Sequence, residues 1–178
     1  RARGTGSGKR TEYRAVARRE RRSIEDAARA ARYAARRAVA AKRGYPLVAT
    51  AHTLSDHAET VILHLLRGTD PKGLLGIPVQ RPLIPSPYPL PAVGGERNMV
   101  GSSPKVSVVR PLLCLTRAEV MEYLRFFKLK HRVDETNRDE AFTRNWVRRR
   151  VIPLLKRKSP RLEQHLGLLS AKLARKLR

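Results

Sequence analysis

Ala51-His-Thr-Leu-Ser-Asp-His-Ala-Glu-Thr-Val-Ile-Leu-His-Leu-Leu-Arg-Gly68 is the stretch that decides the fold. The short apolar run from Leu47 to Ala51 predicts a buried strand, and the spacing from Asp56 to Arg67 predicts an amphipathic helix. The apolar face of that helix is expected to contain Ala58, Val61, Ile62 and Leu65. The sequence therefore predicts a junction between a strand and a helix in an α/β fold.

Titratable side chains gather at this junction. His52, Asp56 and Glu59 fall where the strand ends and the helix begins, and in open α/β sheets that edge binds ligands. A purely structural interpretation is also open, in which Asp56 caps the helix, Glu59 closes a capping box, and His52 and His57 lie on the connecting loop. No metal site is predicted, because the histidine spacing matches no His-x-x-x-His helical pair.

The charge of the chain points to a class of partner. Its 178 residues include 39 Lys and Arg against 15 Asp and Glu, for a formal charge of +24. That excess attracts polyanions, so nucleic acid is the predicted partner. The charge is +11 in residues 1–43, +3 in residues 44–137 and +10 in residues 138–178. We expect the ends to bind and the middle to carry chemistry; the alternative is that Arg-rich helices merely present solvated faces.

Other features bear on the compartment. No apolar run approaches the roughly 20 residues that span a bilayer, so no membrane partner is expected. The single cysteine, Cys114, excludes an internal disulfide and indicates a reducing compartment. The chain opens with Arg1 rather than Met, so a fragment or a processed product is expected. The predicted compartment is the cytoplasm; the alternative is a mitochondrion or plastid, which suits the Arg-rich start.

Two further helices and a strand are predicted around the junction. One helix begins at Ser23 and ends before Gly44, and another begins at Thr116 with Glu119 completing a capping box. The segment Val106–Arg110 alternates weakly as a strand. The apolar residues at helical spacing in the helix after Thr116 are Val120, Tyr123, Leu124 and Phe127.

We divide the chain into a basic flexible segment (1–22), a partial α/β domain (23–156) and a basic C-terminal helix (157–178). Residues 79–105 form a proline-rich insertion in that domain, with little room for helix or central strand. An apolar seam on the last helix needs a partner, either the domain body or something beyond Arg178. The seam consists of Leu162, Leu166, Leu169 and Leu173.

Several sequence blocks, taken in order, resemble one known family. The central blocks are His52-x-x-x-Asp56-x-x-Glu59-Thr60, Leu65-Leu-Arg-Gly68 and Gly73-Leu-Leu-Gly-Ile-Pro78. The flanking blocks are Ala28-Arg-Ala-Ala-Arg-Tyr33, Arg110-Pro-Leu with Arg117-Ala-Glu119, and Asp134-Glu-Thr-Asn137 with Arg144-Asn145 and Pro153-Leu-Leu. Together they resemble the tRNA(Ile)-lysidine synthetases of the PP-loop ATP pyrophosphatase superfamily. The resemblance implies the C-terminal part of a Rossmann-like (adenine nucleotide alpha hydrolase-like) PP-loop domain with parallel strands, followed by basic helices.

The resemblance also implies an activity and its residues. Such enzymes use ATP and Mg²⁺ to adenylate C2 of the wobble cytidine of an isoleucine tRNA, and free lysine then displaces AMP. By motif match, His52, Asp56 and Arg67 would be catalytic, and Ala51, His52, Asp56 and Glu59 would bind ATP. The residues implied to bind tRNA or to position substrate are Arg29, Arg32, Arg110, Arg117, Asn137, Arg144, Asn145, Arg148, Arg149 and Arg150. The implied partners are tRNA and free lysine, and a homodimer or a ribonucleoprotein association is left open.

The sequence also departs from the family pattern. Thr53, Ser55 and His57 stand where the family usually has His, Asp and Gln, and the sequence contains no Ser-Gly-Gly-x-Asp-Ser loop, the family's ATP-pyrophosphate cradle. Two classes of function therefore stay open: an N-terminally incomplete lysidine-forming ligase, and a non-catalytic RNA-binding protein or ribonucleoprotein component derived from the family. A related enzyme that thiolates tRNA is disfavoured, because such enzymes generally use cysteine pairs and only Cys114 is present.

Overall fold

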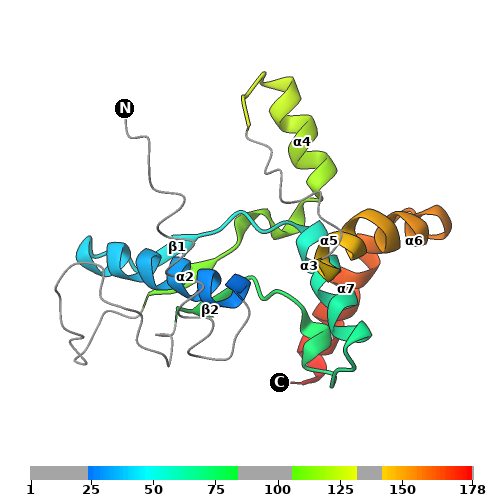
Figure 1. The fold of residues 1–178 in the computed structure, drawn as a ribbon, viewed down its shortest axis with the longest axis horizontal. Coiled ribbons are helices and arrows are strands. Elements are labelled where there is room, and N and C mark those ends of the chain that lie inside the picture. Colours follow the sequence, from blue (N-terminus) through cyan, green and yellow to red (C-terminus); the bar gives the residue numbers. More distant parts are fainter. Residues whose placement is uncertain (1–23, 84–105, 132–141, 178) are drawn as a thin grey trace. The chain divides into compact units, whose positions relative to one another are not determined.

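The computed structural model describes residues 24–83, 106–131 and 142–177, with the side chains of residues 24–29 excepted (Figure 1). These residues form two compact units, one built from residues up to 48 and from 81 to 108, the other from residues 49–80 and from 109 onward. The predicted basic segment 1–22, the Ser23 cap and most of the proline-rich insertion lie outside the described residues.

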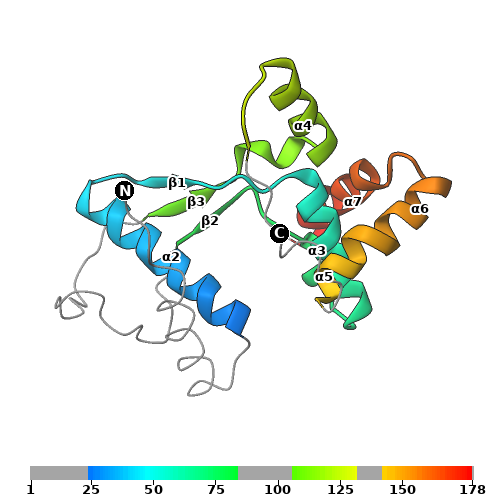
Figure 2. The same ribbon diagram turned by 45° about the horizontal axis from the view of Figure 1, so that its top comes forward.

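The first unit is built around helix α2 (Ile24–Lys42). As predicted, this helix ends before Gly44, and the amide of Tyr45 donates to the carbonyl of Ala40 at 2.9 Å. Its buried residue Ala40 packs against one face of a short sheet, beside which α2 lies in Figure 2. The other residues of this apolar core are Leu83, Val106 and Val108, with Tyr33 and Val48 packed against them.

The sheet contains β1 (Leu47–Ala49), β2 (Gln80–Pro82) and β3 (Ser107–Val109), in the order β1-β3-β2. The Ser107 amide donates to Pro46 and the Thr50 amide donates to Val109, so β1 and β3 are parallel, as predicted. β2 runs antiparallel to β3 and begins inside the segment predicted as an insertion. It lies at the edge of the sheet, where a proline is tolerated because no ladder hydrogen bond is required of it.

Helix α3 (Leu54–Leu66) opens the second unit and begins earlier than its predicted start at Asp56. Thr53 is the N-cap: its Oγ1 accepts from the Asp56 amide, and Asp56 Oδ2 accepts from the Thr53 amide at 2.9 Å. The predicted capping box of Asp56 with Glu59 is therefore wrong by one turn. The predicted apolar face is buried at Ala58, Val61 and Ile62, whereas Leu65 is 54% exposed.

The chain continues through two one-turn helices, η1 (Gly73–Leu75) and η2 (Pro111–Cys114), before helix α4 (Arg117–Phe126). The predicted capping box of Thr116 with Glu119 is confirmed, and the two Thr116 donors lower the pKa of the Glu119 carboxyl, the side-chain hydroxyl most. The amide of Arg117 donates to Ser55 Oγ at 2.9 Å, which fastens the start of α4 to α3.

The helices α5 (Thr143–Trp146), η4 (Val147–Val151) and α6 (Ile152–Lys158) follow one another without an interruption. η4 is a π-helical turn just before Pro153, whose ring would clash with the carbonyl four residues earlier in an ordinary α-helix. The widened turn accommodates this proline. The predicted basic helix around Trp146 to Arg150 is confirmed.

Helix α7 (Leu162–Lys176) packs against α3 within the second unit. The apolar core of this unit contains Ile62 and Leu63 of α3, Val147 of η4 and Ile152 of α6. Val151 and Leu166 pack against it. The leucine seam on α7 thus has its partner in the domain body at Leu166, whereas Leu169 is exposed. In the described part of the chain, no helix has both the length and the apolar character needed to cross a membrane.

Replacing Gly76 by alanine is expected to destabilise the second unit more than the same change at Gly68. Both glycines have positive φ, at +59° and +70°, which costs an alanine about 1–2 kcal/mol. An added Cβ at Gly76 would also lie 2.6 Å from Cε1 of His57, whereas nothing lies within 4 Å at Gly68. Urea denaturation, followed by Trp146 fluorescence, measures the free energy of unfolding of both variants. Equal losses of stability would contradict this prediction, because they would show that the His57 ring moves aside without destabilising the unit.

Candidate functional site

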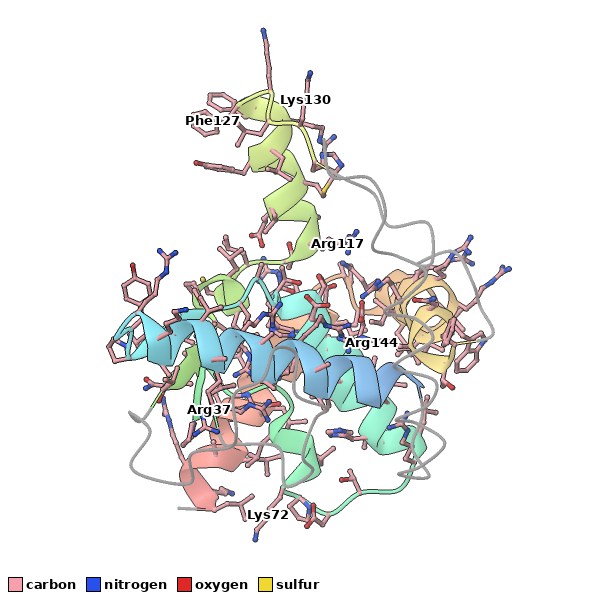
Figure 3. The ribbon with its side chains drawn as sticks, turned by 60° about the vertical axis from the view of Figure 1, so that its left-hand side comes forward. Arg37, Lys72, Arg117, Phe127, Lys130 and Arg144 are labelled. Atoms are coloured by element: carbon pink, nitrogen blue, oxygen red, sulfur yellow. The ribbon has the colours of Figure 1, made fainter. Side chains whose placement is uncertain are left out.

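Two carboxylates on α3 face two guanidinium groups from α5 and η4. Asp56 and Glu59 are three residues apart, and Arg144 and Arg148 are four apart, so each pair lies on one side of its helix. Arg148 holds Glu59 in a two-pronged ion pair, with Nε on Oε1 at 2.5 Å and Nη2 on Oε2 at 2.9 Å. Arg144 Nε also donates to Glu59 Oε2 at 2.9 Å. We call these four side chains the acid–arginine cluster; Arg144 is labelled in Figure 3.

The cluster neutralises a buried charge. The Glu59 side chain is only 3% exposed, and a carboxylate so far from water is tolerated when it is paired and hydrogen-bonded. The hydrogen bond with Glu59 raises the pKa of Arg148 above its ordinary value, despite opposing burial. With two negative and two positive groups, the cluster has no net charge.

Asp56 joins the cluster to the start of α3. Its Oδ1 lies 3.5 Å from a terminal nitrogen of both Arg144 and Arg148. Its Oδ2 accepts from the amide and from the hydroxyl of Thr53, each at 2.9 Å. Because both oxygens are engaged, the carboxylate has a fixed orientation, and its side chain is still 23% exposed.

His52 and Arg110 lie at the carboxyl ends of the two parallel strands. Ala51 is exposed, and His52 is half-buried with Nδ1 3.0 Å from Thr50 Oγ1. Arg110 is only 3% exposed and donates from Nη1 to the Pro78 carbonyl, while its buried Nε has no hydrogen-bond partner among the described residues. The Thr50 amide bonds to the residue just before Arg110, so these groups share one edge of the sheet.

His57 lies inside α3, and the prediction that it belongs to the connecting loop is wrong. Its Nδ1 accepts from the Ile77 amide at 3.1 Å, so Nε2 carries the proton and donates to Ser170 Oγ at 3.0 Å. Ser170 in turn donates to the Leu74 carbonyl at 2.7 Å. Burial lowers the pKa of His57. A neutral imidazole thus connects α3 with α7 and with the loop after η1.

The remaining predicted site residues are dispersed. Arg67 follows α3 as its C-cap, with an exposed side chain, and Arg117 is exposed at the start of α4. Arg149 and Arg150 are exposed on η4, and Asn145 is buried on α5.

Two of the predicted tRNA contacts belong to α2 of the first unit, and another falls outside the structure. Arg32 is exposed on that helix, and Arg29 lies in the part of it whose side chains are not described. Asn137 lies outside the described residues.

Sequence reasoning missed the pairing of Glu59 with two arginines and the bond from His57 to Ser170. The partners are separated by 85, 89 and 113 residues, so no local pattern connects them. The available signal was the matched helical spacing of the acids and of the arginines. The Thr53 cap could have been found, because Thr-x-x-Asp is a local capping pattern.

Residues 9–155 match the family model described as the PP-loop domain, and the chain belongs to that family. Among its relatives is the tRNA(Ile)-lysidine synthase of Dehalococcoides mccartyi, which is 42% identical over 142 residues, covering 80% of this chain and 27% of the relative. The synthase of Geobacter sulfurreducens is 38% identical over 163 residues, covering 92% and 30%. That of Porphyromonas gingivalis is 38% identical over 144 residues, covering 81% and 27%. The chain thus spans less than a third of the length of these relatives.

Glu59→Gln is expected to lower the free energy of unfolding by about 3–5 kcal/mol, because it leaves two guanidinium groups short of a buried carboxylate. Glu122 is an exposed carboxylate on α4, and Glu122→Gln is the matched control, expected to change stability by roughly 0.5 kcal/mol or less. Urea denaturation compares the two. Similar small losses would contradict the structural role of the cluster.

The pH dependence of stability is expected to report the burial of His57. Since its pKa is lower in the folded than in the unfolded state, its contribution is complete above about pH 6.5. That contribution falls as the pH drops below this value toward the folded-state pKa. His57→Gln keeps a donor and an acceptor but does not titrate, so its stability should decrease less over the same range. Urea denaturation across that range measures this, and an unchanged decrease would contradict the assignment.

Proposed function

We propose that this chain is part of an ATP-dependent ligase that joins lysine to C2 of the wobble cytidine of an isoleucine tRNA. Membership of the PP-loop domain family supports the use of ATP, and relatives that carry the name tRNA(Ile)-lysidine synthase support tRNA modification. One structural observation carries the proposal. His52 and Asp56 lie where β1 passes into α3, at the edge where α/β sheets bind nucleotides.

The residues at this edge fit the phosphates of a nucleotide. Arg110 directly follows β3, and within the part of the chain that the structure describes its buried Nε is a cationic donor without an acceptor. Phosphate oxygens are acceptors that suit a guanidinium group. Ala51 follows β1 closely and is exposed, so it leaves room for a ligand beside the backbone.

In this proposal, most ligands of Mg²⁺ would come from the substrate rather than from the protein. Within the described residues, no group of three or more His, Cys, Asp and Glu side chains is placed to hold a metal. Both oxygens of Asp56 are already engaged by Thr53 and by two arginines. Mg²⁺ commonly binds through substrate phosphates with one or two carboxylates, so the phosphates would supply most of its ligands.

The chemistry assigns a task to each group at this edge. Bound ATP supplies the adenylyl group that activates the cytidine. Arg117, whose amide is bonded to Ser55 at the start of α3, is an exposed cation suited to the negative charge that develops on the leaving group, whereas Arg67 lies at the far end of α3. Lysine must react as the free amine, and His52 is the group suited to take up its proton. Asp56, held by the acid–arginine cluster, orients the incoming ammonium group.

A separate surface would hold the tRNA backbone. Arg149 and Arg150 are exposed on η4, whereas Arg144 and Arg148 of the same helical segment bind carboxylates. Contacts from exposed arginines to phosphates position an RNA without reading its sequence.

The alternative function is a non-catalytic RNA-binding protein. It is favoured by the neutralisation of Asp56 and Glu59 and by the formal charge of +24. It predicts that tRNA binding, with an affinity that falls steeply with salt, occurs without release of AMP.

Asp56→Asn is expected to lower the rate of lysine-dependent AMP release on isoleucine tRNA by about 100-fold or more, while tRNA binding is retained. The asparagine keeps an oxygen for Thr53 and removes only the charge. Thr53→Ala is the matched control, because it loses the helix cap and keeps the carboxylate. A radiometric assay of AMP measures the rate, and equal losses in both variants would contradict a role for the charge.

An assay of AMP release by the unsubstituted full-length protein that contains this chain distinguishes the two functions. AMP release that requires both lysine and tRNA supports the ligase, as does a Ser-Gly-Gly-x-Asp-Ser loop encoded ahead of Arg1. Salt-sensitive tRNA binding without any AMP release by the full-length protein that contains this chain overturns the ligase proposal and supports the alternative.

A further inference from the structure

The end of α4 presents three aromatic rings to solvent. Tyr123, Phe126 and Phe127 are 59%, 79% and 53% exposed. The Phe127 ring lies 4.6 Å from that of Tyr123 and 5.0 Å from that of Phe126, measured between centroids, so the rings form one contiguous surface. Tyr123 and Phe127 are among the apolar residues at helical spacing in this helix. Their exposure indicates an interaction site, because contiguous exposed apolar surface commonly marks one.

Basic side chains follow these rings along the chain. Residues 123–131 include Arg125, Lys128 and Lys130 and no acidic residue, and the nearest carboxylate in sequence is the exposed Glu122, which precedes Tyr123. Lys128 has a φ of +51°, and the amide of Leu129 turns back to the Leu124 carbonyl at 2.8 Å. This left-handed turn ends the helix, and Figure 3 shows Phe127 and Lys130 at the same end of α4. We call Tyr123, Phe126, Phe127, Lys128 and Lys130 the aromatic–lysine end.

The combination of rings and lysines favours RNA over an apolar protein partner. The cores of protein–protein interfaces are depleted of lysine, whereas single-stranded nucleic acid is bound by aromatic rings that stack on bases beside cations that contact phosphates. A duplex hides its base faces, so it could use only the cations. Arg125 and the lysines also match the positive charge of the whole chain.

We propose that the aromatic–lysine end binds unpaired bases of an RNA, which stack on Phe126 and Phe127 while Lys128 and Lys130 contact the adjoining phosphates. This inference rests on the proposed function in one respect, namely that the ligand of the chain is an RNA. It adds a site for unpaired nucleotides on α4, apart from the arginines of η4.

The test compares two fluorescein-labelled RNAs, a hairpin with an unpaired loop and a blunt duplex of equal length. Phe126→Leu, alone and combined with Phe127→Leu, keeps the surface apolar but removes the rings. Loss of stacking is expected to weaken binding of the hairpin by about tenfold and to leave binding of the duplex unchanged. Phe127→Tyr keeps a ring of the same size and is the matched control, which should bind the hairpin like the parent. Fluorescence anisotropy measures the affinity of the parent and of the three variants for each RNA, and urea midpoints equal to that of the parent show that the variants are folded.

The outcomes separate this inference from the proposed function. If the parent binds neither RNA, RNA binding itself fails. If the parent binds both RNAs equally well, or if the leucine variants lose hairpin and duplex alike, only the stacking site is overturned. Unchanged hairpin binding in the leucine variants also overturns the stacking site. If the parent then proves to be a dimer that Phe126→Asp dissociates, the surface binds a second copy of the chain.

Discussion

The burial of one carboxylate, that of Glu59, constrains the second unit more than any other single contact. An unpaired charge at that depth would cost several kcal/mol, so α3 must lie where Arg148 can reach both oxygens and Arg144 can reach one. The two helices are thereby fixed in rotation as well as in distance, because only one face of each carries the matching charges. Such a pair contributes less to stability than to the choice of a single packing arrangement. That arrangement also brings Asp56, one turn earlier on α3, within 3.5 Å of both arginines.

The three departures from the family pattern each have a structural partner. Thr53 caps α3, Ser55 accepts from the first amide of α4, and His57 connects α3 with Ser170. Polar groups that could have faced a ligand therefore hold helices together. The chemistry available at the start of α3 is concentrated in His52 and Asp56, and Asp56 is itself partly committed to the cap.

Local patterns predicted much of the fold, and their failures have physical causes. Capping residues and periodicity located α2, α4 and the β1–α3 junction, since these signals act within one or two turns. The start of α3 was misplaced because Thr53, rather than Asp56, supplies the capping oxygen. Leu65 and Phe127 are exposed although each belongs to a run at helical spacing, because periodicity identifies a face but not whether anything covers it. The position of Asp56 in the first turn of α3 follows from local sequence, whereas the arginines opposite Asp56 depend on contacts across some 88 residues.

The placement of positive charge follows from the same helical geometry. The acid–arginine cluster consumes two cations and two anions, so it contributes nothing to the formal charge of +24. Arg149 and Arg150 follow Arg148 directly, on other sides of the same helical segment, and both are exposed. One helical segment therefore orients Asp56 with one side and presents cations with another. An RNA phosphate held by those exposed arginines, as proposed above, would be bound to the same helical segment that holds the carboxylate of Asp56.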